Sequence, residues 1–315
     1  MLTIYQNTGG GKIEKSQEIK QNSWLKLISP TLSEIVNVAE ALSIPQNFLE
    51  DSLDIDERPR IEEHGENILM IIHVPFEKMD VINLADDVKY RTIPLGIIHT
   101  KDHFITICRE NIPFLQDIMS GHEIQFSTHM KTRNTFGIIH ETASAFIKYL
   151  SRIDKAIIEA EEELAKSYRN RELYSLLNLN ESLLYMATSL KQMKYMMQKV
   201  LHGNYIKLYD EDKAIIDDAL VELEQAHEVA EISQSNLSNL MDAYGNVIQN
   251  NVSHMLKFLA AITIVFSMPT LVASIYGMNV PLPFQDEPHM FTVLIIVMVI
   301  LCGLCSFVFY KKRYF

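Results

Sequence analysis

The chain has 315 residues, a formal net charge of −12 and three cysteines. The negative charge argues against a nucleic-acid partner, because phosphates attract clustered lysine and arginine side chains. Two of the cysteines, Cys302 and Cys305, lie in an apolar run, so we expect no disulfide framework and a reducing compartment for the charged part of the chain. No arrangement of nucleophile and base emerges, and we do not expect an enzyme.

Residues 1–130 mix strand and short-helix patterns and predict an α+β domain in the cytoplasm. Apolar, β-branched runs at 68–74, 93–98 and 104–108 predict strands. Thr31, with Glu34 three residues later, predicts a helix that begins with a capping box and continues to Ala41.

Residues 131–257 have the periodicity of long helices. No proline occurs between Pro113 and Pro269, and the apolar spacing predicts helices at 132–168, 171–202 and 207–276. The last helix would be about 105 Å long at 1.5 Å per residue. Its polar, acidic part predicts a stalk, and its end is the first of two apolar segments.

Two segments are long and apolar enough to cross a membrane. They span residues 258–277 and 290–310, and neither segment contains Lys, Arg, Asp or Glu. Each such charge would cost about 2.5–3.5 kcal/mol at the centre of a membrane helix. The alternative is a buried core hairpin, which the length of both runs disfavours.

The distribution of positive charge predicts the orientation of these two membrane helices. The loop 278–289 has no Lys or Arg, whereas Lys257 precedes the first segment and the tail 311–315 is basic. The positive-inside rule therefore places both termini in the cytoplasm and the loop outside. Asp286 and Glu287 give that loop an acidic character on the side from which a cation would arrive.

Four hydroxyl residues of the first segment fall on one helical face, within an arc of roughly 60° at 100° per residue. They are Thr263, Ser267, Thr270 and Ser274. A polar face without charge suits the lining of a pore, but small and hydroxyl residues are also used for helix packing in membranes. Because one helix pair cannot enclose a water-filled path, a pore would require a homo-oligomer.

The end of the first segment is marked by residues that interrupt a helix. Pro269 cannot donate a backbone hydrogen bond, and we expect a bend there with the freed carbonyl facing the bundle. Gly277 permits a sharp turn or a close approach of backbones around an axis. Asn279 offers a neutral amide oxygen at the outer mouth.

The sequence Tyr276-Gly277-Met278-Asn279, followed by one more apolar segment and a basic tail, resembles the signature of the CorA family of magnesium and divalent-cation transporters. The resemblance extends along the chain, including Arg58-Pro59-Arg60-Ile61-Glu62 before a strand. It implies a funnel-shaped homopentamer in a prokaryotic plasma membrane. Its fold would be an α+β cytoplasmic domain followed by a long helical stalk and two transmembrane helices.

The resemblance also implies roles for individual residues. Gly277, Met278 and Asn279 would form the selectivity filter, with Asn279 contacting Mg²⁺ through its hydration shell. The hydroxyl residues would line the pore, and Leu256 and Leu259 would form its hydrophobic gate. The family often has asparagine where this chain has Ser253, so the inner polar ring would be formed by Ser253 or by Asn250 and Asn251.

The resemblance further implies a regulatory carboxylate at Asp218, which would bind intracellular Mg²⁺ between neighbouring subunits. Glu77 and Asp80 are candidate partners, and a solvated helix face is the alternative for Asp218. Mg²⁺ would be both the transported and the regulatory ion, with no other cofactor. Two alternatives stay open for the whole protein. One is transport of Zn²⁺, Co²⁺, Ni²⁺ or another divalent metal, including efflux, and the other is a membrane-anchored coiled-coil scaffold that conducts nothing.

Overall fold

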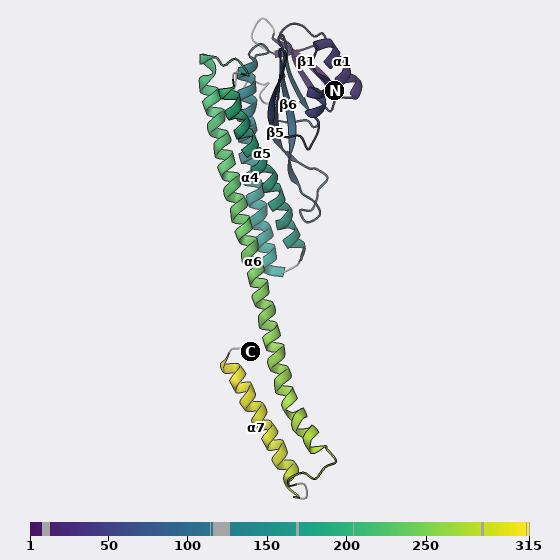
Figure 1. Ribbon diagram of the computed structural model, residues 1–315, viewed down its shortest axis with the longest axis vertical. Coiled ribbons are helices and arrows are strands. Elements are labelled where there is room, and N and C mark those ends of the chain that lie inside the picture. The colour runs from purple at the N-terminus through teal and green to yellow at the C-terminus, as the bar shows by residue number, and fades with distance from the viewer. Residues whose placement is uncertain are drawn as a thin grey trace. The chain divides into compact units, whose positions relative to one another are not determined.

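The computed structural model describes residues 1–7, 13–113, 115, 127–167, 170–203, 205–284, 287–312 and 314 (Figure 1). The chain divides into two compact units, Met1–Ser238 and Asn239–Phe315. Of the residues predicted to have a function, Asp286 lies outside the described residues.

The first unit is built on a seven-stranded sheet with the order β2-β1-β3-β7-β6-β5-β4. Strands β3 and β7 pair in parallel, and the other neighbouring strands pair antiparallel. The strand predictions are confirmed by β5, β6 and β7. The strands are β1 (Leu2–Asn7), β2 (Ile13–Ser16), β3 (Trp24–Ile28), β4 (Arg60–His64), β5 (Asn67–Glu77), β6 (Tyr90–His99) and β7 (Phe104–Cys108).

Helices α1 (Leu32–Leu42) and α2 (Gln46–Asp51) pack on one face of this sheet. The predicted capping box is confirmed: the Glu34 amide donates to Thr31 Oγ1 at 3.3 Å, and the Thr31 amide donates to Glu34 Oε2 at 2.9 Å. Side chains two residues apart on each strand point to the same face. Alternate positions such as Leu69 and Ile71 therefore join α1 and α2 in one core.

Helices α4 (Lys131–Ser167) and α5 (Asn170–His202) lie against strands β4, β5 and β6. Both helices begin and end within two residues of the predicted positions. Three buried groups join the sheet to α5 by hydrogen bonds: Ser189 Oγ lies 2.7 Å from His73 Nδ1 and 2.9 Å from Thr92 Oγ1. These bonds satisfy polar groups that would otherwise be costly to bury.

Helix α6 (Lys213–Tyr276) begins six residues later than the predicted start at 207 and follows the 3-10 turn Asp210–Asp212. Tyr209 has an extended backbone, with φ −108° and ψ 144°. The three acidic residues after it lie where the positive end of the helix dipole favours negative charge. The helix has 64 residues and includes Pro269.

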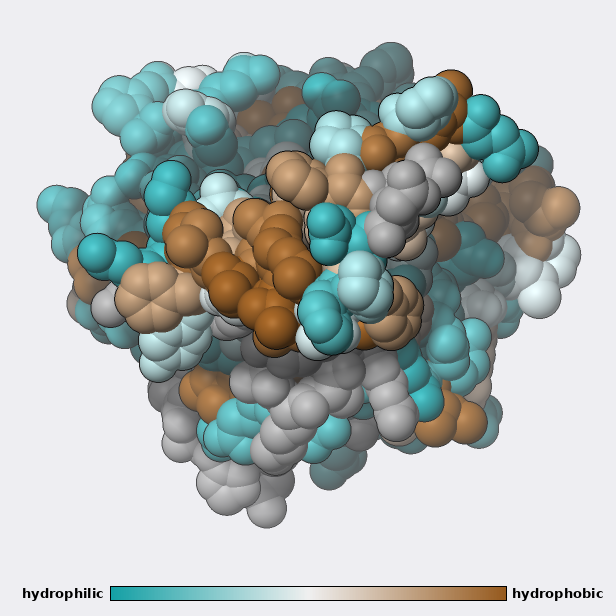
Figure 2. All heavy atoms as spheres, turned by 90° about the horizontal axis from the view of Figure 1, so that it is seen from below, coloured by the Kyte–Doolittle hydropathy of each residue, from teal (hydrophilic) through white to brown (hydrophobic). Residues whose placement is uncertain are grey.

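The second unit contains the C-terminal part of α6 and helix α7 (Met290–Lys311). The apolar windows of these helices are 6% and 0% buried, and both helices are long and apolar enough to cross a membrane. The core helix of a soluble protein would be mostly buried, so the buried-hairpin alternative is excluded. Figure 2 shows hydrophobic side chains gathered on the surface of the molecule, as expected for helices that contact lipid or other copies of the chain.

Candidate ion pathway and metal site

The predicted hydroxyl strip, which consists of Thr263, Ser267, Thr270 and Ser274, is exposed on α6 in the single chain. It lines a shallow groove of about 570 Å³ whose walls are the flanking apolar residues Ile262, Phe266 and Leu271. The strip is therefore an accessible polar track between apolar borders. The structure places its four hydroxyl residues together, as the 3.6-residue periodicity predicts.

Three of the four hydroxyl groups of this strip have a common orientation. Thr263 Oγ1 donates to the Leu259 carbonyl at 2.8 Å, and Ser267 Oγ donates to the Thr263 carbonyl at 2.7 Å. Thr270 Oγ1 donates to the Phe266 carbonyl at 3.2 Å. Each proton is used within the helix, so the oxygen lone pairs remain available as hydrogen-bond acceptors. Acceptors of this kind suit the protons of a cation's water shell.

The opposite face of α6 packs against α7. Val265 and Val272 are half-buried, and they lie nearly 180° from the centre of the hydroxyl strip at about 100° per residue. Pro269 cannot donate to the Val265 carbonyl, and Cys302 Sγ of α7 donates to that carbonyl instead, at 3.6 Å. The freed carbonyl thus faces α7 and not the hydroxyl strip. The strip is not used for packing within the chain.

The Gly277-Met278-Asn279 segment directly follows the end of α6. The Gly277 amide still donates to the Ala273 carbonyl at 2.9 Å, and the Met278 amide donates to the Ile275 carbonyl at 3.3 Å. Gly277 does not have a positive φ, so the predicted sharp turn is not what requires glycine there. A Cβ atom at Gly277 would lie 3.2 Å from the Ala273 oxygen, which is tight. Met278 and Asn279 are exposed.

The residues of the predicted gate lie on the same face as the hydroxyl strip. Leu256 is 61% exposed and Leu259 is 52% exposed in the single chain. Ser253 Oγ donates to the Gln249 carbonyl at 2.9 Å, so it also presents acceptor lone pairs. Asn250 and Asn251 are exposed.

Asp218 lies in a pocket of about 290 Å³ in the first unit, together with Arg133 and His140 of α4 and Glu211. Its side chain is exposed, as is that of Asp217. Among the described residues, no group of three or more His, Cys, Asp or Glu side chains has the arrangement needed to hold a metal ion.

The two candidate partners of Asp218 differ in their surroundings. Glu77 is already paired with Lys89 at 2.9 Å and with Arg152 at 3.2 Å, whereas Asp80 is exposed. Neither lines the Asp218 pocket of the same chain. Sequence analysis missed Arg133 and His140 there. Their spacing of seven residues places them on one face of α4, but only the packing of α4 beside α6 reveals that this face meets Asp218.

The acidic loop residue Glu287 is exposed, and its amide donates to the Phe284 carbonyl at 3.2 Å. Phe284 has a positive φ of 65°, an unusual conformation for an aromatic residue. The loop between α6 and α7 thus turns sharply near Phe284. Glu287 remains accessible after that turn.

Comparison with known proteins places the whole chain in one family. Residues 20–312 match the model of the CorA-like Mg²⁺ transporter proteins. The chain is 22% identical over 300 residues to the cobalt/magnesium transport protein CorA of Methanocaldococcus jannaschii, covering 92% of this chain and 90% of that protein. It is 23% identical over 338 aligned positions to the magnesium transport protein CorA of Campylobacter jejuni, covering 99% of both chains.

A solved structure extends this similarity to the fold. The complete structure of the CorA magnesium transporter from Methanocaldococcus jannaschii superposes with a TM-score of 0.83 at 21% identity, covering 100% of this chain and 99% of that one. The α+β unit, the long helix and the two apolar helices are common to the fold. With two exposed apolar helices and a match of this extent, the chain is a membrane protein that belongs to the CorA family.

Proposed function

We propose that this protein is a passive, channel-like transporter that carries hydrated Mg²⁺ across a prokaryotic plasma membrane as a homopentamer. The observation that carries the proposal is the hydroxyl strip, which faces away from α7 and presents acceptor oxygens in an open groove. The curated relatives are named as magnesium or cobalt/magnesium transport proteins, which supports a divalent cation as the substrate.

The chemistry of the strip fits an ion that keeps its water. Mg²⁺ loses its water shell reluctantly and prefers octahedral oxygen ligands. Hydroxyl oxygens whose protons are used within the helix accept hydrogen bonds from that shell without replacing it. Five copies of Asn279 would receive the hydrated ion at the outer mouth, beside Gly277 and Met278. Neutral amides hold the ion more weakly than a ring of carboxylates would, and so allow it to leave.

The membrane potential would drive the ion inward. A divalent ion gains about 4.6 kcal/mol per 100 mV of potential. The basic residues Lys257 and Lys311 flank the apolar segments on one side, and this supports cytoplasmic termini. Glu287 in the outer loop would raise the local concentration of cations.

The gate would be a hydrophobic constriction formed by five copies of Leu256 and Leu259. A narrow apolar neck blocks ions because it does not hold water. The high exposure of both leucines in the single chain is explained if they meet their counterparts around a central axis. Ser253, or Asn250 and Asn251, would form a polar ring next to this neck.

Intracellular Mg²⁺ would close the pathway by binding at Asp218. Asp218 and Glu211 line one pocket with Arg133, and the missing ligands would come from a neighbouring subunit. A bound cation would neutralise the repulsion between the acidic surfaces of adjacent copies and hold them together. Loss of the cation at low Mg²⁺ would release them.

The test is ion flux into liposomes that contain the purified protein. We expect uptake of Mg²⁺ at low internal Mg²⁺, driven by an inside-negative potential and absent from empty liposomes. Uptake of Zn²⁺ without Mg²⁺ would replace the proposed ion by another divalent metal. No flux of Mg²⁺, Co²⁺ or Zn²⁺ would favour the non-conducting scaffold and reject transport.

A further inference from the structure

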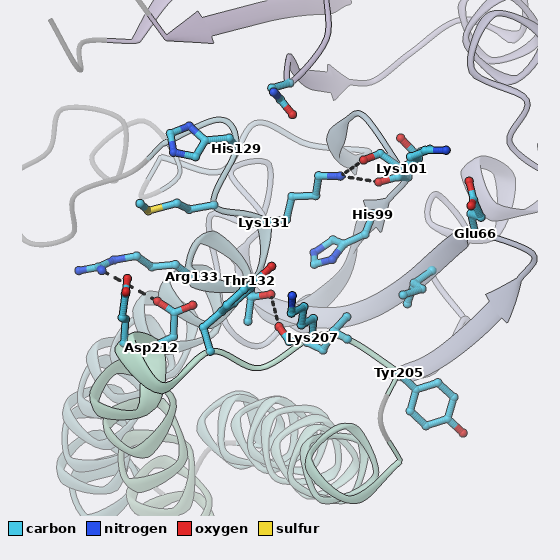
Figure 3. Close-up of a pocket in the computed structure, with 17 residues that line it drawn as sticks. Glu66, His99, Lys101, His129, Lys131, Thr132, Arg133, Tyr205, Lys207 and Asp212 are labelled. Carbon is cyan, nitrogen blue, oxygen red and sulfur yellow. Dashed lines mark hydrogen bonds and ion pairs between the residues drawn. The ribbon is translucent and has the colours of Figure 1, made fainter.

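The first unit contains a second and larger pocket, of about 500 Å³, which the transport pathway does not use (Figure 3). It forms where the turn between β6 and β7, the start of α4 and the segment 205–212 meet. Four basic side chains line it: Lys101, Lys131, Arg133 and Lys207. Among the described residues, the three lysines have no ion pair with a carboxylate. The pocket therefore contains three lysines that form no direct ion pair with a described residue, although three carboxylates also line it.

The start of helix α4 adds to this positive charge. The residue before the helix is Met130, which has no oxygen for capping, and the first turn contains Lys131 and Arg133 but no acidic residue. The helical hydrogen bonds begin with the Asn134 amide, which donates to the Met130 carbonyl at 2.9 Å. Basic residues are unfavourable at this end of a helix, because its free amides are already positive. An anion bound there would relieve the repulsion.

Lys131 is held inside the pocket although burial opposes its charge. Its ammonium group donates to the Thr100 carbonyl at 2.5 Å and to the Lys101 carbonyl at 2.7 Å. Burial lowers the pKa of Lys131, and the charge of Asp102 only partly opposes this effect. Holding a half-buried cation at the start of a helix costs stability. This cost is consistent with a role in binding.

Two of the acidic residues that line the pocket, Asp212 and Glu66, lie on opposite sides of it in Figure 3. Asp212 is 3.9 Å from Arg133, and Figure 3 shows the two side chains together at one end of the pocket. Glu66 lies at the other side of the view, with Lys131 and Lys207 between the two acidic positions. Glu211 is the third carboxylate of the lining. Basic side chains therefore lie between the two acidic positions that Figure 3 labels.

The size and the aromatic residues of the pocket indicate the class of ligand. A volume of about 500 Å³ is in the range of small-molecule sites and is too large for a simple inorganic anion. Tyr205 and Tyr209 line it, and the Lys207 ammonium lies 5.0 Å from the centre of the Tyr209 ring. Aromatic rings beside basic side chains suit a ligand with both a ring and a phosphate.

We propose that this pocket binds a phosphorylated small molecule of nucleotide size. Lys207 and the start of α4 hold the phosphate, and Tyr205 and Tyr209 contact the ring. Phosphate accepts several charge-assisted hydrogen bonds at once, and the N-terminus of a helix is well suited to bind it. We take the ligand to be a soluble metabolite, because every residue that lines the pocket belongs to the first unit and none to the apolar segments.

The pocket also connects to Asp218. Arg133 and Glu211 line both this pocket and the Asp218 pocket. Arg133 repels a divalent cation at Asp218, and a bound phosphate would offset that charge. Occupancy by the phosphate should thus strengthen cation binding at Asp218, and cation binding should strengthen phosphate binding by the same factor. This coupling rests on the proposed inhibitory role of Asp218, whereas the binding itself does not.

The binding is tested by isothermal titration calorimetry of the full-length protein in detergent with AMP, a nucleotide that chelates Mg²⁺ weakly. We expect AMP to bind the wild type, and Lys207→Ala to weaken the binding roughly tenfold or more, because it loses a charge-assisted hydrogen bond to the phosphate. Lys207→Arg keeps the charge and should bind within a few-fold of the wild type. The control is Lys191→Ala, an exposed lysine of α5 outside the pocket, which should have no effect.

Three results would overturn this assignment. The first is the absence of binding by both AMP and inorganic phosphate. The second is equal AMP affinity in the wild type and Lys207→Ala, which would place the nucleotide elsewhere. The third is inorganic phosphate binding as tightly as AMP, which would mean that contacts between the tyrosine rings and the nucleotide ring contribute nothing to the affinity.

The coupling is tested by repeating the AMP titration with and without Mg²⁺. We expect Mg²⁺ to tighten AMP binding in the wild type and to have no such effect in Asp218→Asn. If Mg²⁺ does not change the affinity of the wild type for AMP, the coupling is rejected, but the assignment of the pocket as an AMP site stands. If Asp218→Asn also leaves Mg²⁺ inhibition of transport unchanged, the inhibitory role of Asp218 fails, and AMP binding stands independently of it.

Discussion

At the scale of single residues, the hydroxyl strip acquires its chemistry from the helix that carries it. A threonine or serine within a helix uses its proton on the carbonyl four residues earlier, as Thr263 and Ser267 do. The hydroxyl oxygen can then accept a hydrogen bond from outside the helix but has no proton left to donate. In the proposed pore, a strip of such oxygens would favour a hydrated cation over an anion without any charged side chain.

Replacement of Ser267 by alanine removes one acceptor from every copy of the strip. We expect Ser267→Ala to reduce Mg²⁺ uptake into liposomes roughly fivefold, because one hydrogen bond contributes about 1 kcal/mol. The control is Val272→Ala on the face that packs against α7. If both variants transport at the wild-type rate, the strip serves helix packing instead of conduction.

Asp218 and Asp217 form a matched pair for testing regulation. Both side chains are exposed, but of the two only Asp218 lines the pocket with Glu211 and Arg133. Asp218→Asn removes a charged ligand and should raise the internal Mg²⁺ concentration that halves transport by roughly tenfold or more. Asp217→Asn should leave it unchanged. An identical response in the two variants would make Asp218 an ordinary surface charge.

Residue-level predictions from the sequence succeeded where the cause was local. The capping box of Thr31 and Glu34 was predicted correctly, because it depends only on two residues that lie three positions apart in the sequence. The hydrogen bond from Cys302 to the Val265 carbonyl was not predicted, because it depends on how α7 is aligned with α6. The need for glycine at position 96 could not be predicted from the sequence either. A Cβ atom there would lie 2.0 Å from Ser52 Oγ, and this contact joins elements that are distant in the sequence.

At the scale of elements, the sheet shows which features a sequence reveals. The existence of β5, β6 and β7 follows from their apolar runs. Their order in the sheet does not, because β3 pairs in parallel with β7 across about eighty residues of intervening chain. The start of α6 was predicted six residues too early, since the segment 207–209 is apolar enough to continue the helical pattern but has an extended residue at Tyr209.

The junction between β6 and α4 makes the first unit sensitive to acid. His99 is buried, its Nε2 lies 2.7 Å from Thr135 Oγ1, and burial lowers its pKa from 6.5 to about 3. The folded state holds His99 neutral, whereas the unfolded chain takes up a proton below pH 6.5. The contribution of His99 to stability is therefore complete above pH 6.5 and is lost as the pH falls toward 3. At pH 5 the loss is about 2 kcal/mol.

This acid sensitivity can be measured through Trp24, the single tryptophan of the chain, which is buried in the first unit. We expect the fluorescence-detected unfolding temperature of the full-length protein to fall between pH 7 and pH 5. His99→Gln keeps a hydrogen-bonding group without titrating and should show a smaller fall, although its stability at pH 7 is lower. An equal fall in both proteins would mean that other groups cause the acid sensitivity.

At the scale of the whole molecule, a single chain leaves much of its apolar surface uncovered. In the proposed pentamer, further copies of α6 would cover the exposed leucines of the gate and close the open groove along the hydroxyl strip. The sequence predicted the need for an oligomer from the two membrane segments, but the number of copies comes only from the family resemblance. No spacing within one chain determines how many helices surround an axis.

A homopentamer can be tested by the mass of the detergent-solubilised protein. Five copies of the 36.2 kDa chain have a mass of 181 kDa. Native mass spectrometry should give this value for the wild type after removal of detergent. A dimer as the largest species would reject the pentamer, and with it the pore formed by five copies of α6.

The central claim is that a hydrated divalent cation enters the protein at Asn279 and passes along the hydroxyl strip. The most direct test is potential-driven Mg²⁺ uptake into liposomes by the wild type, Asn279→Ala and Val280→Ala, an exposed neighbour in the same loop. The account predicts uptake by the wild type and Val280→Ala, and loss of selective uptake by Asn279→Ala with assembly intact. Normal, selective uptake by Asn279→Ala would contradict it.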